Sequence, residues 1–143
     1  MEPSVLRKRV HDAIESGRHA AANRRAVNEA ASRSWQTALE TVVVPAWRQT
    51  VQVLRAEGYL FQVSTPSGAV RVSLEKTPQD GVELTLDTTG PEPSLLQRVT
   101  RSRGRDTTSD ERIVVSGTEA IGALADEQAC GLLLSAMAPF FER

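Results

Sequence analysis

Residues 98–105 carry four arginines and no acidic residue, and a fifth arginine follows at Arg112. The full set is Arg98, Arg101, Arg103, Arg105 and Arg112. Guanidinium groups hold phosphates and carboxylates through paired hydrogen bonds. On a strand, Arg101, Arg103 and, if the strand extends far enough, Arg105 would point the same way, because side chains alternate between faces. The group therefore has the chemistry to contact an anionic partner.

Three interpretations of this arginine group differ in what it contacts. A solvated hairpin edge is favoured, because charges on an edge strand also prevent edge-to-edge aggregation. Asp106, Asp110 and Glu111 follow closely enough to neutralise part of the group. An acidic protein partner is the second interpretation, and nucleic acid is the third. The net charge of the whole chain is −1, which opposes strong binding to nucleic acid.

A second group of cations lies in the N-terminal part of the chain. It contains Arg7, Lys8, Arg9, Arg18, Arg24, Arg25 and Arg33. These side chains are widely spaced, have acidic residues among them, and have no aromatic residues between them for base stacking. A solvated helix surface is favoured, and an anion-docking surface is the alternative. Together with the 98–112 hairpin, this group defines one alternative function, that of a nucleic-acid-associated accessory protein.

Residue types that support catalysis or metal binding are scarce. His11, Glu15 and His19 follow at four-residue intervals on one helical face, but no further ligand lies nearby to complete a tetrahedral metal site. The sequence has no glycine-rich phosphate loop and no nucleophile elbow. The single cysteine, Cys130, is expected to be a packed or interface thiol. We therefore predict no catalytic residue, no metal, no cofactor and no enzymatic activity, and no motif resembles that of a known family.

The composition is that of an ordinary globular domain. The 143 residues are 40% hydrophobic and 24% charged, which argues against global disorder. The first residues lack the apolar core of a signal peptide, and no apolar run approaches the roughly 20 residues that span a bilayer. We expect no membrane contact and a cytoplasmic location.

Residues 4–57 are predicted to be helical. They are rich in Ala, Arg, Glu and Gln, and no turn cluster interrupts them. An alanine-rich apolar stripe with 3–4 spacing runs along the first half and strengthens from Trp35 onward. Pro45 removes a backbone donor, so we expect a kink near 41–45, with two separate helices as the alternative. Gly58 is predicted to end the helix.

From Tyr59 onward, hydrophobic residues alternate with polar ones, which is typical of strands. Residues 59–63, 70–74 and 82–86 predict an antiparallel meander, and residues 95–103 and 111–116 predict a further hairpin closed by residues 104–110. A final helix is predicted from Asp126, whose side chain is expected to cap it. The predicted fold class is α+β, with a long N-terminal helix, an antiparallel sheet of about five strands and a C-terminal amphipathic helix.

The apolar face of this sheet is expected to pack against both helices. The residues expected at this contact are Trp47, Val51, Leu54, Leu133, Met137 and Phe140. Trp47 is expected against the sheet, and Trp35 nearer to a helix–helix contact. The chain is thus divided into residues 1–57, a helix that serves as an association element, and residues 58–143, a sheet and helix that pack on residues 35–57.

The first half of the long helix has no sheet face left to cover. A projecting helix with a bare apolar stripe is marginal in water, so we predict that it forms a homodimer or docks into a larger complex. The predicted contact residues are Val10, Ile14, Ala21, Val27, Ala31 and Trp35. The favoured function is a non-enzymatic interaction or assembly module. Besides the nucleic-acid alternative, a small-ligand binder with a pocket between helix and sheet is a weaker possibility.

Overall fold

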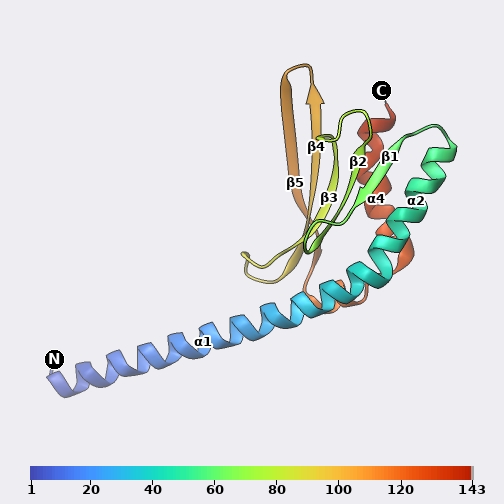
Figure 1. Cartoon of the computed structure of the whole chain (residues 1–143). Helices are drawn as coiled ribbons and strands as arrows, with labels where there is room; N and C mark the ends of the chain where they lie inside the picture. Colours follow the sequence, from blue (N-terminus) through green and yellow to red (C-terminus); the bar gives the residue numbers. More distant parts are fainter. Residues whose placement is uncertain (143) are drawn as a thin grey trace.

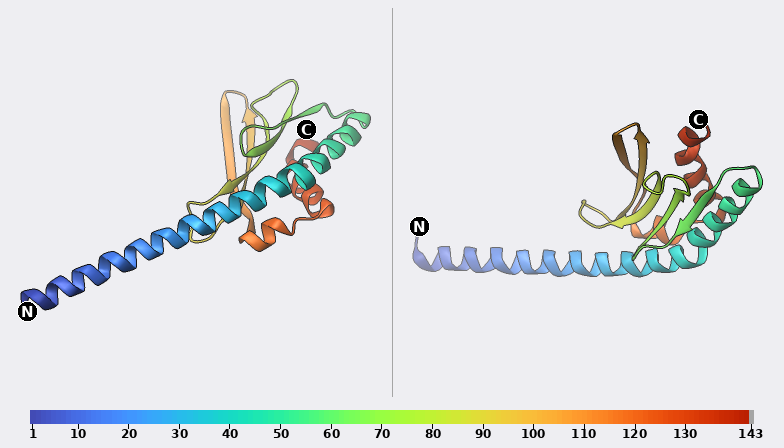
Figure 2. Two further views of the ribbon diagram at one scale, coloured as in Figure 1. Left: turned by 60° about the horizontal axis from the view of Figure 1, so that its bottom comes forward. Right: turned by 45° about the horizontal axis from the view of Figure 1, so that its top comes forward.

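The N-terminal helix runs without interruption from Pro3 to Ala56 in the computed structural model, which describes residues 1–142 (Figure 1). It consists of an α-helix, α1 (Pro3–Ala38), a short π-helical segment, η1 (Leu39–Val43), and a second α-helix, α2 (Val44–Ala56). The three segments form one rod that bends near η1 (Figure 2). The long helix predicted over 4–57 is confirmed, and Pro45 follows the bend without breaking the helix.

The π-helical segment matches the spacing of the buried residues around it. Every fourth residue over 31–51 is buried: Ala31, Trp35, Leu39, Val43, Trp47 and Val51. An α-helix has 3.6 residues per turn, so a four-residue repeat drifts around the axis by about 40° at each step. The wider π turn, closed by the Val44 N–H donating to the Leu39 carbonyl, opposes this drift. It also accommodates Pro45, which has no N–H to donate to Thr41.

The end of α2 is set by Gly58. This residue has a φ angle of 95°, which is natural to glycine. Its N–H donates to the Arg55 carbonyl at 3.0 Å, and the N–H of Tyr59 donates to the Leu54 carbonyl at 2.9 Å. This pair of bonds is the Schellman motif, which satisfies the last carbonyls of a helix. The predicted helix end at Gly58 is confirmed, and the chain turns there toward the sheet.

The strands in residues 1–142 form one five-stranded antiparallel sheet, in which they are ordered as in the chain. They are β1 (Phe61–Ser64), β2 (Ala69–Leu74), β3 (Gly81–Asp87), β4 (Ser94–Arg103) and β5 (Asp106–Ser116). The meander and the following hairpin are thus confirmed. The observed fold class is α+β, as the sequence predicts.

The β4–β5 hairpin differs from the prediction in its turn. A loop is expected over 104–110, but β5 begins at Asp106, and only Gly104 and Arg105 form the turn. Gly104 has a φ angle of 61°, the positive value that the first central position of a type II′ hairpin turn requires. Residues 106–110 are polar, so they lack the alternation that marks a half-buried strand. Their pairing with β4 holds them in the sheet instead.

Two helices follow the sheet. The short α3 (Thr118–Gly122) is absent from the predicted elements, whereas α4 (Asp126–Phe141) is the expected C-terminal helix. The N-cap of α4 is Ala125, so Asp126 is its first helical residue and not the expected cap. A carboxylate at this position still interacts favourably with the positive end of the helix dipole. Figure 1 shows α2 and α4 on the same side of the sheet.

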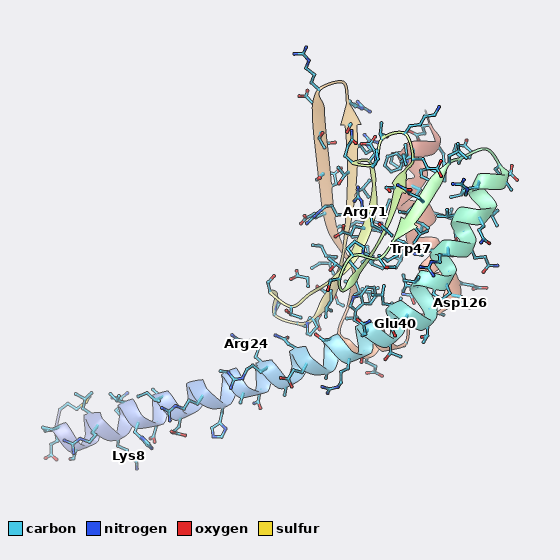
Figure 3. The ribbon with its side chains drawn as sticks, in the orientation of Figure 1. Lys8, Arg24, Glu40, Trp47, Arg71 and Asp126 are labelled. Atoms are coloured by element: carbon cyan, nitrogen blue, oxygen red, sulfur yellow. The ribbon has the colours of Figure 1, made fainter. Side chains whose placement is uncertain are left out.

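The core lies between this side of the sheet and the two helices. The residues expected there are buried, namely Trp47, Val51, Leu133, Met137 and Phe140, with Leu54 partly buried. Trp47 lies on the side of α2 that faces the rest of the molecule (Figure 3).

The indole N–H groups of the two tryptophans donate hydrogen bonds to different elements. Nε1 of Trp47 donates to the Ala129 carbonyl in α4 at 2.9 Å, whereas Nε1 of Trp35 donates to the Gly68 carbonyl in the β1–β2 turn at 2.8 Å. Trp47 therefore contacts α4 as well as belonging to the core beside the sheet, and Trp35 contacts the β1–β2 turn. A buried indole N–H needs an acceptor, and the rod passes the β1–β2 turn at Trp35 and α4 at Trp47.

The outer face of the sheet, opposite the helices, carries a ladder of alternating charges. Arg71, Glu83, Arg98 and Glu111 are successive register partners across β2, β3, β4 and β5. Arg71 and Glu83 approach to 3.9 Å, and Arg98 and Glu111 to 2.8 Å. Opposite charges on neighbouring strands stabilise the pairing modestly. The alternation of the strands correctly predicts that this face is the polar one.

The first part of α1 extends well beyond the other elements, as both views in Figure 2 show. Lys8 lies on this part, with no other element beside it (Figure 3). The buried residues of α1 begin only at Ala31, and the stretch before it spans roughly 40 Å at 1.5 Å per residue. Among the helices that the structure describes, none is both long and apolar enough to cross a membrane.

Candidate functional site

The arginines of the β4–β5 hairpin do not form one row. Arg98 lies in the outer charge ladder, where its Nε donates to Oε1 of Glu111 at 2.8 Å. Arg105 lies in the turn at the tip of the hairpin, so the strand does not extend far enough to align it with Arg101. These two arginines are therefore separated from the rest of the group.

Arg101, Arg103 and Arg112 share the inner face of the hairpin, on the side of α4. Arg101 and Arg103 occupy alternate positions of β4, in phase with Gln97. Gln97 is the register partner of Arg112 on β5, so Arg112 lies on the same face. The fold thus places Arg101 of β4 and Arg112 of β5, which lie on opposite sides of the hairpin turn in the sequence, on the same face of the sheet.

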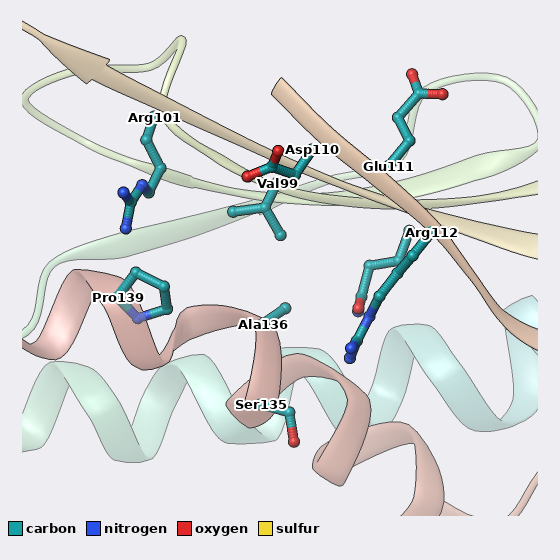
Figure 4. A pocket seen from close by; sticks show the side chains of 9 residues that line it. Val99, Arg101, Asp110, Glu111, Arg112, Ser135, Ala136 and Pro139 are labelled. Atoms are coloured by element: carbon teal, nitrogen blue, oxygen red, sulfur yellow. The ribbon is translucent and has the colours of Figure 1, made fainter. Parts of the chain in front are cut away.

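A cavity of about 420 Å³ lies between this inner face and α4 (Figure 4). Arg101 and Arg112 extend toward α4 from either side of Asp110, whereas Glu111 points away from it. Within residues 1–142, none of the three side chains of Arg101, Asp110 and Arg112 forms an ion pair. The cavity wall therefore presents two positive charges and one negative charge that have no charged partner in the described chain.

The opposite wall of the cavity belongs to α4. Ser135, Ala136 and Pro139 line it, and Val99 of β4 adds a further apolar side chain. Pro139 has no N–H, so the carbonyl of Ser135 receives no helical hydrogen bond from that position. The cavity therefore combines an apolar surface with a few polar groups, the usual composition of small-ligand sites.

Gln97 also lines this cavity and is 1% exposed. Its Nε2 donates to the Leu132 carbonyl in α4 at 3.1 Å. Its Oε1 is buried, and no group of the described chain donates a hydrogen bond to it. Only the NH₂ group of the Gln97 amide can donate to a carbonyl, so the bond to Leu132 identifies Oε1 as the amide atom that has no hydrogen-bond partner.

Gln97 is absent from the residues predicted from the sequence. The signal that could have found it is local: a polar amide stands between Leu95 and Val99, at an inner position of an alternating strand. Ser135 and Pro139 carry no comparable signal, because only the folding of α4 onto the hairpin brings them to the cavity.

The arm of α1, residues 3–21, is a second candidate site. Leu6, Val10 and Ile14 are each about half-exposed, and Ala13 and Gly17 complete a stripe with them. This set of five residues is named the arm stripe. At 3.6 residues per turn, the arm stripe faces the same side of α1 as Ala31 and Trp35.

The predicted self-association residues are divided between the arm and the core. Val10, Ile14 and Val27 are exposed, and Ala21 is half-buried. Ala31 and Trp35 are 0% and 2% exposed, because they are covered by the chain itself. The surface that remains accessible to a partner therefore ends before Ala31.

Other residues with reactive side chains are not assembled into a site. Among residues 1–142, no group of three or more His, Cys, Asp or Glu side chains is placed to hold a metal ion. Cys130 is half-buried, and its Sγ accepts a hydrogen bond from Oγ1 of Thr50 at 3.4 Å. The histidines of the arm, His11 and His19, are exposed.

A scan against protein-family models matched no family, and searches of curated proteins and of solved structures found no match.

Proposed function

We propose that the protein is a non-enzymatic assembly module in which the arm of α1 pairs with the arm of a second copy of the chain. One observation carries the proposal: the arm stripe continues, on the same side of α1, a surface that is already an interface within the chain. Ala31 and Trp35 are buried at one end of this surface, whereas Leu6 and Val10 at the other end are half-exposed. A second copy offers a surface of matching chemistry and length.

Pairing would remove the arm stripe from water. Helices that contact no other element are marginally stable, and full burial of a large aliphatic side chain contributes about 1.5–3 kcal/mol. Leu6, Val10 and Ile14 are about half-exposed, so each arm has a substantial fraction of this free energy to gain. The gain opposes the loss of translational and rotational freedom on association.

The residue order favours an antiparallel pair. If Leu6 lies opposite Gly17 of the second copy, Val10 lies opposite Ala13, so each of these two large side chains faces a small one. In the same register, Ile14 lies opposite Arg9. The same register places the cations at positions 7–9 near Glu15 of the second copy. A parallel pair would instead place the cations of both copies side by side, and like charges at such positions repel.

The nucleic-acid alternative has no comparable support. Arg98 is paired with Glu111, and Arg105 lies apart from Arg101, so the described residues of the hairpin offer no continuous row of cations to follow a phosphate backbone. The cations of the N-terminal half-helix are exposed, but acidic residues lie among them and no aromatic residue between them supports base stacking. We therefore keep the assembly function, with the cytoplasm as its expected compartment.

The deciding experiment compares two double variants by light scattering at micromolar concentration. Val10→Glu with Ile14→Glu places charges in the arm stripe and should give the mass of one chain. Ala22→Glu with Ala26→Glu adds the same charges on the opposite side of α1 and should keep the mass of two chains, as in the unsubstituted protein. A single-chain mass for the unsubstituted protein, or a dimer that persists in the first variant, would overturn the proposal.

The orientation is tested by disulfide trapping in a background in which Cys130 is replaced by alanine. A mixture of Leu6→Cys and Gly17→Cys chains should form the mixed disulfide in preference to either symmetric one. Preferential Leu6–Leu6 cross-linking would instead show a parallel pair.

A further inference from the structure

The orphaned amide oxygen of Gln97 requires a physical explanation. A buried acceptor without a donor destabilises the folded chain, and most buried polar groups in proteins are paired. A hydrophobic residue at this inner position would avoid that cost, as Leu95 does two residues earlier on the same face. Gln97 lines the cavity between the inner face of the β4–β5 hairpin and α4, named here the hairpin cavity. Its Oε1 is buried, so a donor that enters the cavity reaches this atom only when the Gln97 side chain moves toward it.

The charged side chains of the cavity indicate which other groups a bound molecule would carry. Arg101 and Arg112 reach toward α4 from two different strands (Figure 4), and a guanidinium group binds a carboxylate through two parallel N–H···O hydrogen bonds. Asp110 lies between them and is the register partner of Val99. Its carboxylate and the Gln97 oxygen are acceptors, which suit an ammonium group.

The apolar part of the cavity selects among molecules that carry both charges. Val99, Ala136 and Pro139 offer an aliphatic surface beside the charged groups, and the volume of about 420 Å³ lies within the range of small-molecule sites. A short aliphatic side chain fits this surface better than a second charged group does.

We propose that the hairpin cavity binds a small zwitterion with an aliphatic side chain, of the chemical class of an α-amino acid. The carboxylate pairs with Arg101 and Arg112, and the ammonium group donates to Oε1 of Gln97 and to Asp110. The aliphatic side chain packs on Val99 and Pro139. This site is separate from the arm, and it does not depend on assembly.

The probe is L-leucine, added to the full chain and followed by NMR through the side-chain amide signals of Gln97. Two matched compounds divide the contacts: leucinamide lacks the carboxylate, and 4-methylpentanoate lacks the ammonium group. We expect leucine to shift the Gln97 signals, and each of the other two to bind about tenfold more weakly or worse, because each loses charge-assisted hydrogen bonds. Equal binding of 4-methylpentanoate, or no shift at about 10 mM leucine, would overturn the proposal.

Substitutions provide the second part of the test, in which calorimetry measures the affinity for leucine. Arg101→Gln and Arg112→Gln should each weaken leucine binding by about tenfold, whereas Arg103→Gln, on the same face but outside the cavity lining, should not change it. Gln97→Leu keeps the size of the side chain and should abolish binding while the chain still folds. Retained affinity in Gln97→Leu, or in both of the first two variants, would contradict the site. If Gln97→Leu fails to fold, the arginine variants alone decide, since their side chains lie at the surface of the hairpin.

Discussion

Trp47 joins the helical rod to α4 through both its size and its indole N–H. It is fully buried, and its Nε1 donates to the Ala129 carbonyl. Trp47→Ala should therefore lower the free energy of unfolding by about 3–5 kcal/mol, the usual range for a buried aromatic residue. Trp47→Phe keeps most of the packing but loses the hydrogen bond, so its loss should be smaller. Denaturant unfolding measures both, and an unchanged midpoint in Trp47→Ala would contradict this position in the core.

The pKa of Asp87, at the end of β3, depends on two hydrogen bonds from Thr89. The hydroxyl of Thr89 donates to its Oδ1 at 2.6 Å, and the Thr89 N–H donates to the same atom at 2.9 Å. These bonds favour the charged form, so they lower the pKa of Asp87 below its ordinary value, the hydroxyl more than the N–H. The contribution of ionised Asp87 to the free energy of unfolding is therefore fully present above the ordinary pKa of an aspartate, and it is lost as the pH falls through the lowered pKa of Asp87.

Thr89→Ala removes the hydroxyl bond and should raise the pKa of Asp87 toward its ordinary value. NMR titration of the carboxyl carbon measures this shift, and Thr88→Ala serves as the control for a change of residue in the same loop. A pKa of Asp87 that is the same in both variants would show that the hydroxyl bond does not form in solution.

Among the secondary-structure elements, the β2–β3 pair depends on a close approach at Gly81. A Cβ atom at this position would overlap the carbonyl oxygen of Val72 and lie 3.0 Å from the Cα of Ser73. Gly81→Ala should therefore destabilise the protein by at least about 1–3 kcal/mol, the cost of overpacking. The matched control is Gly131→Ala in α4, where a Cβ would meet nothing within 4 Å. That variant should be about 0.5–1 kcal/mol more stable, because alanine suits a helix interior better.

The elements show which features of the fold a sequence can predict. Alternation in residues 70–74 and 82–86 predicts their strands because half-burial imposes a period of two. The first half of β5 is polar on both faces, so its pairing with β4 is visible only in the folded chain. The hairpin cavity is hidden for a related reason: register brings Gln97 to Arg112, and packing of α4 adds Ser135. None of these residues is near the others in the sequence.

In the molecule as a whole, the arm should be the region whose stability depends on protein concentration. If arms pair, amide hydrogens in residues 6–20 should exchange more slowly as the concentration rises, because dissociation must precede opening. Amides of β3, in the centre of the sheet, should exchange at the same rate throughout and serve as the internal control. Hydrogen exchange with mass spectrometry measures both regions in one sample. Fast, concentration-independent exchange in the arm would argue against pairing.

The π turn of η1 also determines which way the arm stripe faces around the axis of α1, relative to α2. Each α-helical residue rotates the chain by about 100°, and a π turn contains one residue more than the α turn it replaces. Deleting one residue within 39–43 so that the helix became regular would swing α1 by roughly a quarter turn or more about its own axis, relative to α2. Leu6 and Val10 would then point in a new direction, even though nothing near them had changed. The orientation of two domains joined through their arms is thus encoded at η1, far along the chain from the surface that would join them.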